Sequence, residues 1–280
     1  MADTHSTPIH RDDIISLAGE FIRNAQGNYI DKNAAISPRC EGLMIYEEPI
    51  FAFGSADDAL YEKYKSPGVI GTHFISPKEW MPKAKTVISF FLPYTEAIKS
   101  ANRNDNRWPA DEWLHGRYEG QILLTQLMKY LVKTLSDLGH ETLAPSLERR
   151  YKTGSDEVRF TSNWSERHIS YACGLGTFGL SKGLITRKGI CGRFGSLLTE
   201  LDLPKDSRDY DDVYEYCNMC GACIHRCPVS AISIERGKQS QLCSDFLDSV
   251  RERHNPRYGC GKCQVGVPCE SGEGMTVWKN

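Results

Sequence analysis

Residues 217–228 read Cys217-Asn218-Met219-Cys220-Gly221-Ala222-Cys223-Ile224-His225-Arg226-Cys227-Pro228, and this run decides the fold of its part of the chain. Three cysteines spaced in this way can wrap three irons of a cubane [4Fe-4S] cluster from one tight loop. The fourth cysteine of such a run characteristically binds a second cluster. The spacing therefore predicts a small iron-sulfur module.

A second set of four cysteines follows the run, at Cys243, Cys260, Cys263 and Cys269. The two sets together supply the eight thiols that two cubes require. We therefore expect two [4Fe-4S] clusters, with these eight cysteines as their metal ligands.

The same cysteines have two other interpretations, a structural zinc site and a disulfide framework. Zinc sites usually pair two Cys-x2-Cys motifs across a longer loop, which differs from the spacing of this run. Disulfides need an oxidising compartment, and Met1 to Asp12 is polar, without the apolar core of a signal peptide. Iron-sulfur clusters explain the spacing best, and the thiol content favours a reducing, cytoplasmic location.

Length and charge limit the remaining classes of protein. A chain of 280 residues is long enough for one sizeable domain and a small appended module, which we place at residues 1–205 and 206–280. The 34 basic and 36 acidic residues nearly balance, so no global charge favours nucleic acid or an anionic membrane. Apolar runs such as Val87 to Leu92 fall far short of the ~20 residues of a membrane-spanning helix.

Hydrophobic periodicity in the first two thirds of the chain predicts alternating helices and strands. Apolar residues recur with helical spacing over residues 11–25 and again over 124–138, where the stripe stops at Gly139. Short apolar runs that are typical of strands lie at residues 49–54, 86–92 and 142–144. The expected fold class is α/β.

Glycines are dense after a helix that we expect to begin near Ser165. They stand at positions 174, 176, 179, 183, 189, 192 and 195. Glycine lets backbone amides approach a bound group closely, but turns between a helix and two strands would explain the same density. The glycines end a helix instead of opening one after a strand, so the pattern is not the dinucleotide-binding fingerprint. The stretch permits a bound cofactor without naming it.

The remaining cysteines have no partner by spacing, and a free cysteine is usually a small buried hydrophobe. We expect all three in the core, at Cys40, Cys173 and Cys191. Trp164, His168 and Tyr171 share one helical face, where aromatic packing is favoured over acid-base chemistry.

Several motifs resemble, in their order, those of epoxyqueuosine reductases and of the core of reductive dehalogenases. They are Ala172-Cys173-Gly174-Leu175-Gly176, Gly183-Leu184-Ile185-Thr186, Gly195-Ser196-Leu197-Leu198-Thr199-Glu200-Leu201-Asp202-Leu203, the cysteine run and Tyr258-Gly259-Cys260-Gly261-Lys262-Cys263. The resemblance covers roughly residues 85–270, and it is strongest to the short, stand-alone double-cluster proteins of anaerobes.

The resemblance implies a nitroreductase-like α/β (α+β) domain holding base-off cobalamin, followed by a bacterial ferredoxin-like domain whose clusters deliver electrons to cobalt. It implies that one cluster takes Cys217, Cys220, Cys223 and Cys269, and the other Cys227, Cys243, Cys260 and Cys263. It also implies a corrin-binding face, which we predict to consist of Gly174, Leu175, Gly176, Thr177, Phe178, Gly179, Lys182, Gly183, Gly192, Arg193, Phe194 and Gly195.

Two departures from the family pattern bear on the chemistry. Epoxyqueuosine reductases carry an aspartate as proton donor before the helix that leads to the Gly-Leu-Gly turn, whereas this chain reads Phe160-Thr161-Ser162-Asn163. The last cysteine motif is stretched, because Gln264 to Pro268 separates the final two cysteines. The catalytic residues therefore stay unassigned, with Tyr151 and Tyr171 as candidate proton donors.

Three functions fit these expectations. The first is a cobalamin-dependent reductase of a small molecule, whose clusters receive electrons from an external donor of the ferredoxin or flavodoxin type. The second is an electron-transfer protein that reduces a partner such as a corrinoid protein, and the third is a flavin-dependent reductase. We expect tRNA to be an unlikely partner, because charge is near neutral and no basic extension follows the clusters before Asn280.

Overall fold

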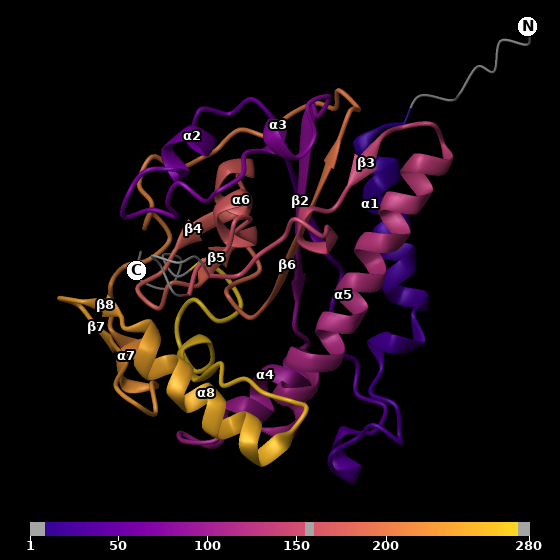
Figure 1. The fold of residues 1–280 in the computed structure, drawn as a ribbon. Helices are drawn as coiled ribbons and strands as arrows, with labels where there is room; N and C mark the ends of the chain where they lie inside the picture. The colour runs from indigo at the N-terminus through magenta and orange to yellow at the C-terminus, as the bar shows by residue number, and fades with distance from the viewer. Residues whose placement is uncertain (1–8, 155–159, 274–280) are drawn as a thin grey trace, which may run out of the picture.

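The computed structural model describes residues 9–154 and 160–273. Its centre is a four-stranded antiparallel sheet in the order β1-β2-β6-β3, formed by Ile50–Ser55, Thr86–Pro93, Gly192–Thr199 and Thr142–Leu143. Every residue of β2 is buried. Helices cover both faces of the sheet (Figure 1), which explains why β2 reads as a nearly continuous apolar run instead of an alternating one.

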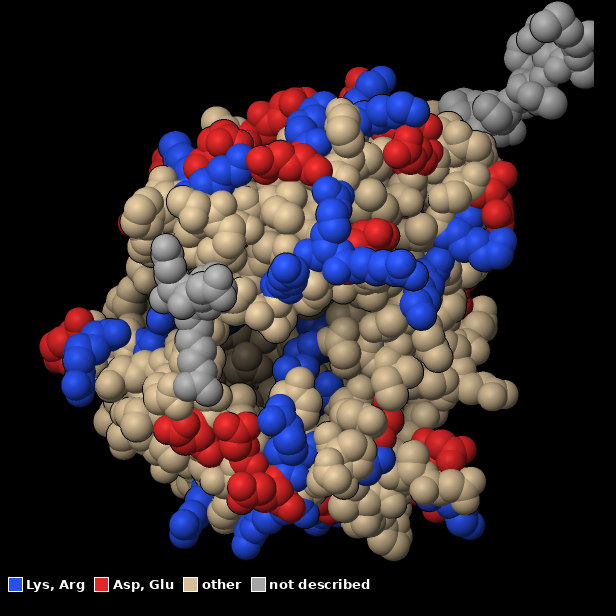
Figure 2. Space-filling view, in the orientation of Figure 1, with Lys and Arg blue, Asp and Glu red and all other residues tan. Residues whose placement is uncertain are grey.

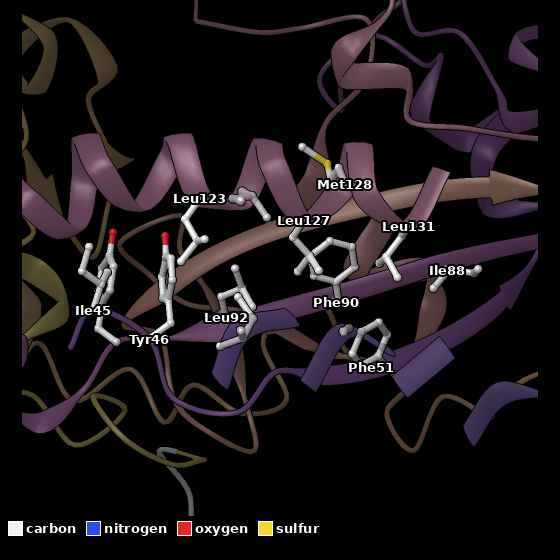
Figure 3. Packing of buried hydrophobic residues seen from close by; sticks show 14 of the residues in the cluster. Ile45, Tyr46, Phe51, Ile88, Phe90, Leu92, Leu123, Leu127, Met128 and Leu131 are labelled. Carbon is white, nitrogen blue, oxygen red and sulfur yellow. The ribbon is translucent and has the colours of Figure 1, made fainter. Parts of the chain in front are cut away.

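Two helices, α1 (Arg11–Asn24) and α5 (Asp111–Asp137), lie on one face of the sheet (Figure 1). The core between them and the sheet is apolar and continuous, and Figure 3 shows side chains of α5 packing onto those of β1 and β2. Both helices were predicted from their periodicity and are confirmed, since the helical stripe of α5 is buried at Leu127 and Leu131. Gly139, with a left-handed φ of 90°, follows the end of α5.

The other face of the sheet carries α6 (Glu166–Cys173) and the short helices α2 (Leu60–Tyr64) and α3 (Pro77–Trp80). Aromatic rings dominate this second core. Side chains of β2 alternate between the two cores: Phe90 belongs to the first, Val87 to the second.

Helix α6 ends at Gly174, whose φ of 94° is a left-handed conformation that glycine adopts readily. The chain then forms the hairpin β4 (Gly176–Phe178) and β5 (Leu184–Thr186) and returns to the sheet as β6. Just before β6, the Ile190 N–H donates to the Cys269 carbonyl at 3.0 Å, so the chain here lies against the segment that holds the cysteines.

Residues 211–273, the cysteine module, are built mainly of loops. Their regular elements are α7 (Ala222–His225), β7 (Ile232–Ser233), β8 (Gly237–Lys238) and α8 (Ser240–His254). The remaining helices of the chain are α4 (Glu96–Arg103) and the 3-10 turns Gln26–Asn28, Pro38–Cys40, Pro145–Leu147 and Lys262–Gln264. Within residues 9–154 and 160–273, no helix has both the length and the apolar character to cross a membrane.

The predicted boundary at residues 205 and 206 stays a prediction, and its terminal segments 1–8 and 274–280 lie outside the described residues. Asp206, the first residue after that boundary, is bonded to strand β1. Its backbone N–H donates to the Phe53 carbonyl at 2.7 Å, and its carboxylate accepts from the Phe53 N–H at 2.8 Å. The chain is thus anchored to the sheet immediately before it enters the cysteine module.

Candidate iron-sulfur and cofactor site

Four of the predicted ligands line one pocket. They are Cys217, Cys220, Cys223 and Cys269. The pKa of the Cys269 thiol is raised to about 12, first by burial and then by the neighbouring thiols of the other three. The structure therefore brings the first three cysteines of the run together with the last cysteine of the chain.

The other four predicted ligands form a second group. Burial raises the pKa of Cys260 to about 12, and the thiols of Cys263 and Cys243 raise it further. Cys263 in turn lies near Cys243 and Cys227. Burial raises the pKa of Cys223 to about 12, and the thiol of Cys263 raises it further, so the two groups adjoin.

The thiol chemistry of both groups fits a cubane cluster. All eleven cysteines are free thiols, and none forms a disulfide. A zinc ion binds each of its sulfur ligands at about 2.3 Å. Among the described residues, no three Cys, His, Asp or Glu side chains are placed to hold a single metal ion. Adjacent buried thiols resist losing their protons, so a cationic iron core would stabilise the thiolates that ligation requires. The ligand assignment stays a prediction.

The stretched loop at residues 264–268 is held from several sides. Arg226 Nε donates to one of its carbonyls at 3.1 Å, and the Cys191 thiol donates to another at 3.0 Å. The Glu270 carboxylate accepts from a backbone N–H of the loop at 2.6 Å and is itself paired with Arg103. The longer spacing before the last cysteine is therefore accommodated by a fixed loop.

The three remaining cysteines are buried, as predicted. The aromatic face of α6 is also confirmed as packing. His168 lies 4.9 Å from the Phe178 ring centroid, and Tyr171 lies 5.1 Å from that of Tyr210. Trp164 belongs to the second core.

The glycines of the predicted corrin-binding face are occupied by contacts with the chain itself. A Cβ atom on Gly176 would lie 1.9 Å from the Ile185 carbonyl oxygen, and one on Gly195 would lie 2.7 Å from the Phe90 ring. Added Cβ atoms would likewise meet other parts of the chain at Gly174, Gly179, Gly183 and Gly192. Close packing of α6, the β4-β5 hairpin and β6 therefore accounts for the glycines at these positions, and a close approach to a cofactor stays a prediction.

The other predicted residues of this face differ in exposure. Leu175 and Thr177 are buried, and Phe178 and Phe194 pack against neighbouring rings. Lys182 is exposed, and Arg193 is half-buried at the start of β6. Cofactor binding at this face stays a prediction.

A hollow opens beside these residues. Figure 2 shows it between the part of the molecule that carries β5 and the part that carries α8, with Lys and Arg atoms along its wall. Burial lowers the pKa of the Arg167 guanidinium, and the charge of Arg193 lowers it further. The thiol of Cys263 lies near this guanidinium, and Cys243 of the same group belongs to α8 beside the hollow.

Sequence reasoning missed Glu166, the first residue of α6. Its Oε2 accepts a hydrogen bond from Ser196 Oγ at 2.6 Å, while its Oε1 is buried and has no partner among the described residues. Burial raises the pKa of Glu166 to about 7, although the Ser196 hydrogen bond and the charge of Arg193 act in the opposite direction. A glutamate in the first turn of a helix is ordinary, so the sequence carried no signal for this environment.

Comparison with known proteins gives matches to iron-sulfur enzymes. The model of the 4Fe-4S binding domain family matches residues 211–233. The epoxyqueuosine reductase of Staphylococcus aureus is 28% identical over 211 residues, which cover 70% of this chain and 51% of the relative. A tetrachloroethene reductive dehalogenase of Desulfitobacterium hafniense is 30% identical over 117 residues, 39% of this chain and 21% of the relative. The chain spans about half the length of the epoxyqueuosine reductases it matches.

Solved structures share the fold. An epoxyqueuosine reductase with an epoxyqueuosine-modified tRNA-Tyr stem loop has a TM-score of 0.51 at 19% identity, covering 93% of this chain and 67% of that one. A catabolic reductive dehalogenase has a TM-score of 0.51 at 14% identity, covering 80% of this chain and 30% of that one. With the helices and strands described above, the likeness confirms the predicted mixed α/β fold class.

The prediction that tRNA is an unlikely partner is wrong in its reasoning. Curated relatives are epoxyqueuosine reductases, and one solved epoxyqueuosine reductase contains a tRNA stem loop. Net charge sums over the whole chain, whereas RNA affinity depends on local groups of Lys, Arg and aromatic side chains. Such a group is present where exposed Arg107 and Arg253 lie over the ring of Trp108. In its cysteine motif and its curated relatives the chain resembles the epoxyqueuosine reductases and the reductive dehalogenases, and it shares the fold of their solved structures.

Proposed function

We propose that this chain is an iron-sulfur oxidoreductase in which two [4Fe-4S] clusters pass electrons to a corrinoid in the hollow, where a substrate is reduced. The observation that carries this proposal is the arrangement of the eight cysteines in two adjoining groups. The first group lines a pocket of its own, and the second includes Cys243 on α8, which borders the hollow. Electrons would therefore pass from one group to the other and on to the hollow.

The corrinoid is the finer part of the proposal and rests on the family resemblance. The glycines are in contact with the chain itself, so the support for a corrinoid in this chain is the hollow beside α8, the helix that carries Cys243. Arg193, Phe194 and Lys182 are the predicted residues that would hold it. When bound, a corrinoid supplies a low-potential cobalt centre that amino-acid side chains lack.

Glu166 is our candidate for the proton source. Reduction of an organic substrate by an electron pair commonly consumes a proton, and an effective general acid has a pKa near the working pH. The carboxyl of Glu166 meets that condition, because burial raises its pKa to about 7. Its unpartnered Oε1 can donate a hydrogen bond when protonated.

A tRNA substrate is a second part of the proposal, because the epoxyqueuosine reductases among the relatives include one solved with a tRNA stem loop. The arginines over Trp108 offer stacking and charge for single-stranded bases. Binding of an anticodon stem loop by the wild-type protein and by Trp108→Ala, measured at several salt concentrations, tests this. A salt-sensitive affinity that falls in Trp108→Ala supports an RNA substrate, and equal affinities reject this surface.

Metal and cofactor content test the main proposal. Protein purified and reconstituted without oxygen should hold about eight irons, with a broad absorbance near roughly 400 nm that bleaches with dithionite. Cys220→Ala and Cys243→Ala should each lose about half of the iron, from different clusters, whereas Cys40→Ala should lose none. Saturation of the wild-type protein at about four irons contradicts the two-cluster proposal.

Acid extraction followed by mass measurement identifies the second cofactor. A corrinoid in the extract supports the proposed reductase. A flavin would instead favour a flavin-dependent reductase, and an extract with neither, from protein offered both, would favour an electron-transfer protein.

A further inference from the structure

Two cations of the cysteine module meet at the end of helix α4. The side chain of Lys262 belongs to a residue with an exposed fraction of 0%, and its Nζ donates to the Asn102 carbonyl at 2.7 Å. Nη2 of Arg226 donates to the same carbonyl at 3.3 Å. Because both groups bond one oxygen atom, two positive charges lie side by side.

Both cations are adjacent to predicted ligands of the second cysteine group. Arg226 directly precedes Cys227, and Lys262 lies two residues after Cys260. Asn102 ties them together, because its side-chain Nδ2 donates to the Cys260 carbonyl at 3.0 Å. Asn102 is itself fully buried. The pair of cations is therefore fixed against the segment that carries these cysteines.

Neither cation has a carboxylate within ion-pair distance in the part of the chain that the structure describes. The remaining bonds of Arg226 go to neutral oxygens: two backbone carbonyls, at 3.1 and 3.2 Å, and the Asn106 side chain. The carboxylate of Asp105, three residues after Asn102, accepts from backbone N–H groups instead. The two positive charges thus lack a counter-charge from the protein.

The end of a helix offers part of an explanation, since cations often bond the last carbonyls of a helix. The C-terminus of a helix carries only roughly half an elementary negative charge, however, and α4 has just eight residues. This partial charge cannot balance two cations, and a buried ammonium group without a counter-charge is costly. Lys262 therefore needs a further anion close by.

We propose that Lys262, with Arg226 beside it, is the counter-charge of the second [4Fe-4S] cluster and raises its reduction potential. The proposal rests on the two clusters of the proposed function and adds which residues favour electron transfer from the first to the second. A cluster bound by four thiolates is negatively charged, and its reduction by one electron, from [4Fe-4S]2+ to [4Fe-4S]1+, makes it more so. A buried cation stabilises the more negative state most strongly, because few water molecules screen it.

A redox titration of the cluster-loaded full chain tests the proposal. The titration is run without oxygen at constant pH and followed by electron paramagnetic resonance, and the signal that Cys243→Ala loses identifies the second cluster. Lys262→Gln removes the charge but keeps a donor for the Asn102 carbonyl, whereas Lys262→Met removes both. The control is Lys129→Gln, on the exposed face of α5.

We expect both Lys262 variants to lower the equilibrium constant for reduction of the second cluster by about tenfold or more, at about 59 mV per tenfold. The first cluster should shift less, and the control should match the wild-type protein. A wild-type potential in Lys262→Gln, with or without a shift in Lys262→Met, would overturn the proposal, because the hydrogen bond to α4 would then be the whole role of Lys262. Equal shifts in both clusters would overturn it as well.

Iron content, measured in the same samples, separates this proposal from the proposed function. Wild-type protein that saturates at about four irons would reject both. Two clusters whose potentials do not respond to Lys262→Gln would reject the counter-charge alone. If both Lys262 variants lose the second cluster, Arg226→Gln decides: a lowered potential of the second cluster supports the proposal, and an unchanged one overturns it.

Discussion

The sheet core and the cysteine module are stabilised in different ways. Every residue of β2 is buried between helices, and the first core continues through α5. In the cysteine module, Val250 is the one buried residue of the 15 in α8, and α7 has none. Burial of apolar surface suffices for the first region, whereas the second has little of it. The contrast implies that the cysteine module depends on what its thiols bind, as small metal-binding domains do.

Removal of iron should give the largest effect. We expect chelation of the iron to abolish hydrogen-exchange protection across α8, because metal binding and folding are coupled in such a module. The backbone amides of β2 and β6 should keep their protection. Hydrogen exchange with mass spectrometry on the loaded and chelated protein measures both regions, and equal loss in the sheet would reject the contrast.

A substitution that opens a cavity in the sheet core should have the opposite effect: it should destabilise the sheet and leave the iron content unchanged. Phe90→Ala removes a fully buried ring between α5 and the sheet, which typically costs about 3–5 kcal/mol in free energy of unfolding. Chemical denaturation of the anaerobic protein measures it, with Ile122→Ala on the exposed face of α5 as control. At a temperature where Phe90→Ala stays folded, its iron content should match that of the wild-type protein.

A side chain at Gly176 should act on packing and not on a ligand. Gly176→Val places a Cβ against the Ile185 carbonyl oxygen and adopts a φ that glycine tolerates best, so we expect a loss of roughly 2–4 kcal/mol. Gly272→Ala, where an added Cβ meets nothing within 4 Å, is the control. If Gly176→Val keeps wild-type stability and loses only cofactor uptake, the glycines line a cofactor after all.

The smallest expected effect is a pH dependence at Glu166. Its folded pKa of about 7 lies above its ordinary value of 4.5, so the protonated form is favoured by folding. Stability from this group therefore falls as pH rises from about 4.5 to about 7 and is constant above that. From about pH 6 to about pH 8 the wild-type protein should lose roughly 1 kcal/mol more than Glu166→Gln. Parallel pH curves for the two proteins would mean that this carboxyl titrates normally.

Spacing and periodicity were reliable where one interaction decides the structure. The apolar stripe of α5 and the run of β2 each have a single way to bury their side chains, so sequence predicted both. The cysteine groups followed from the spacing and the family resemblance. The glycine-rich stretch had two interpretations, turns of the chain or contact with a cofactor. The absence of a side chain permits a close contact but does not show which group makes it. Glu166 was not predictable, since its pKa is set by residues from other elements such as Arg193.

The order of the two cysteine groups along the chain has a consequence for assembly. The first group contains Cys217 and Cys269, while every member of the second lies between these two positions. One loop therefore encloses the other, and a backbone break anywhere from residue 228 to residue 242 would interrupt both. In a split version of the protein with new ends in this stretch, each half would hold part of both groups, so neither half could assemble a complete group by itself.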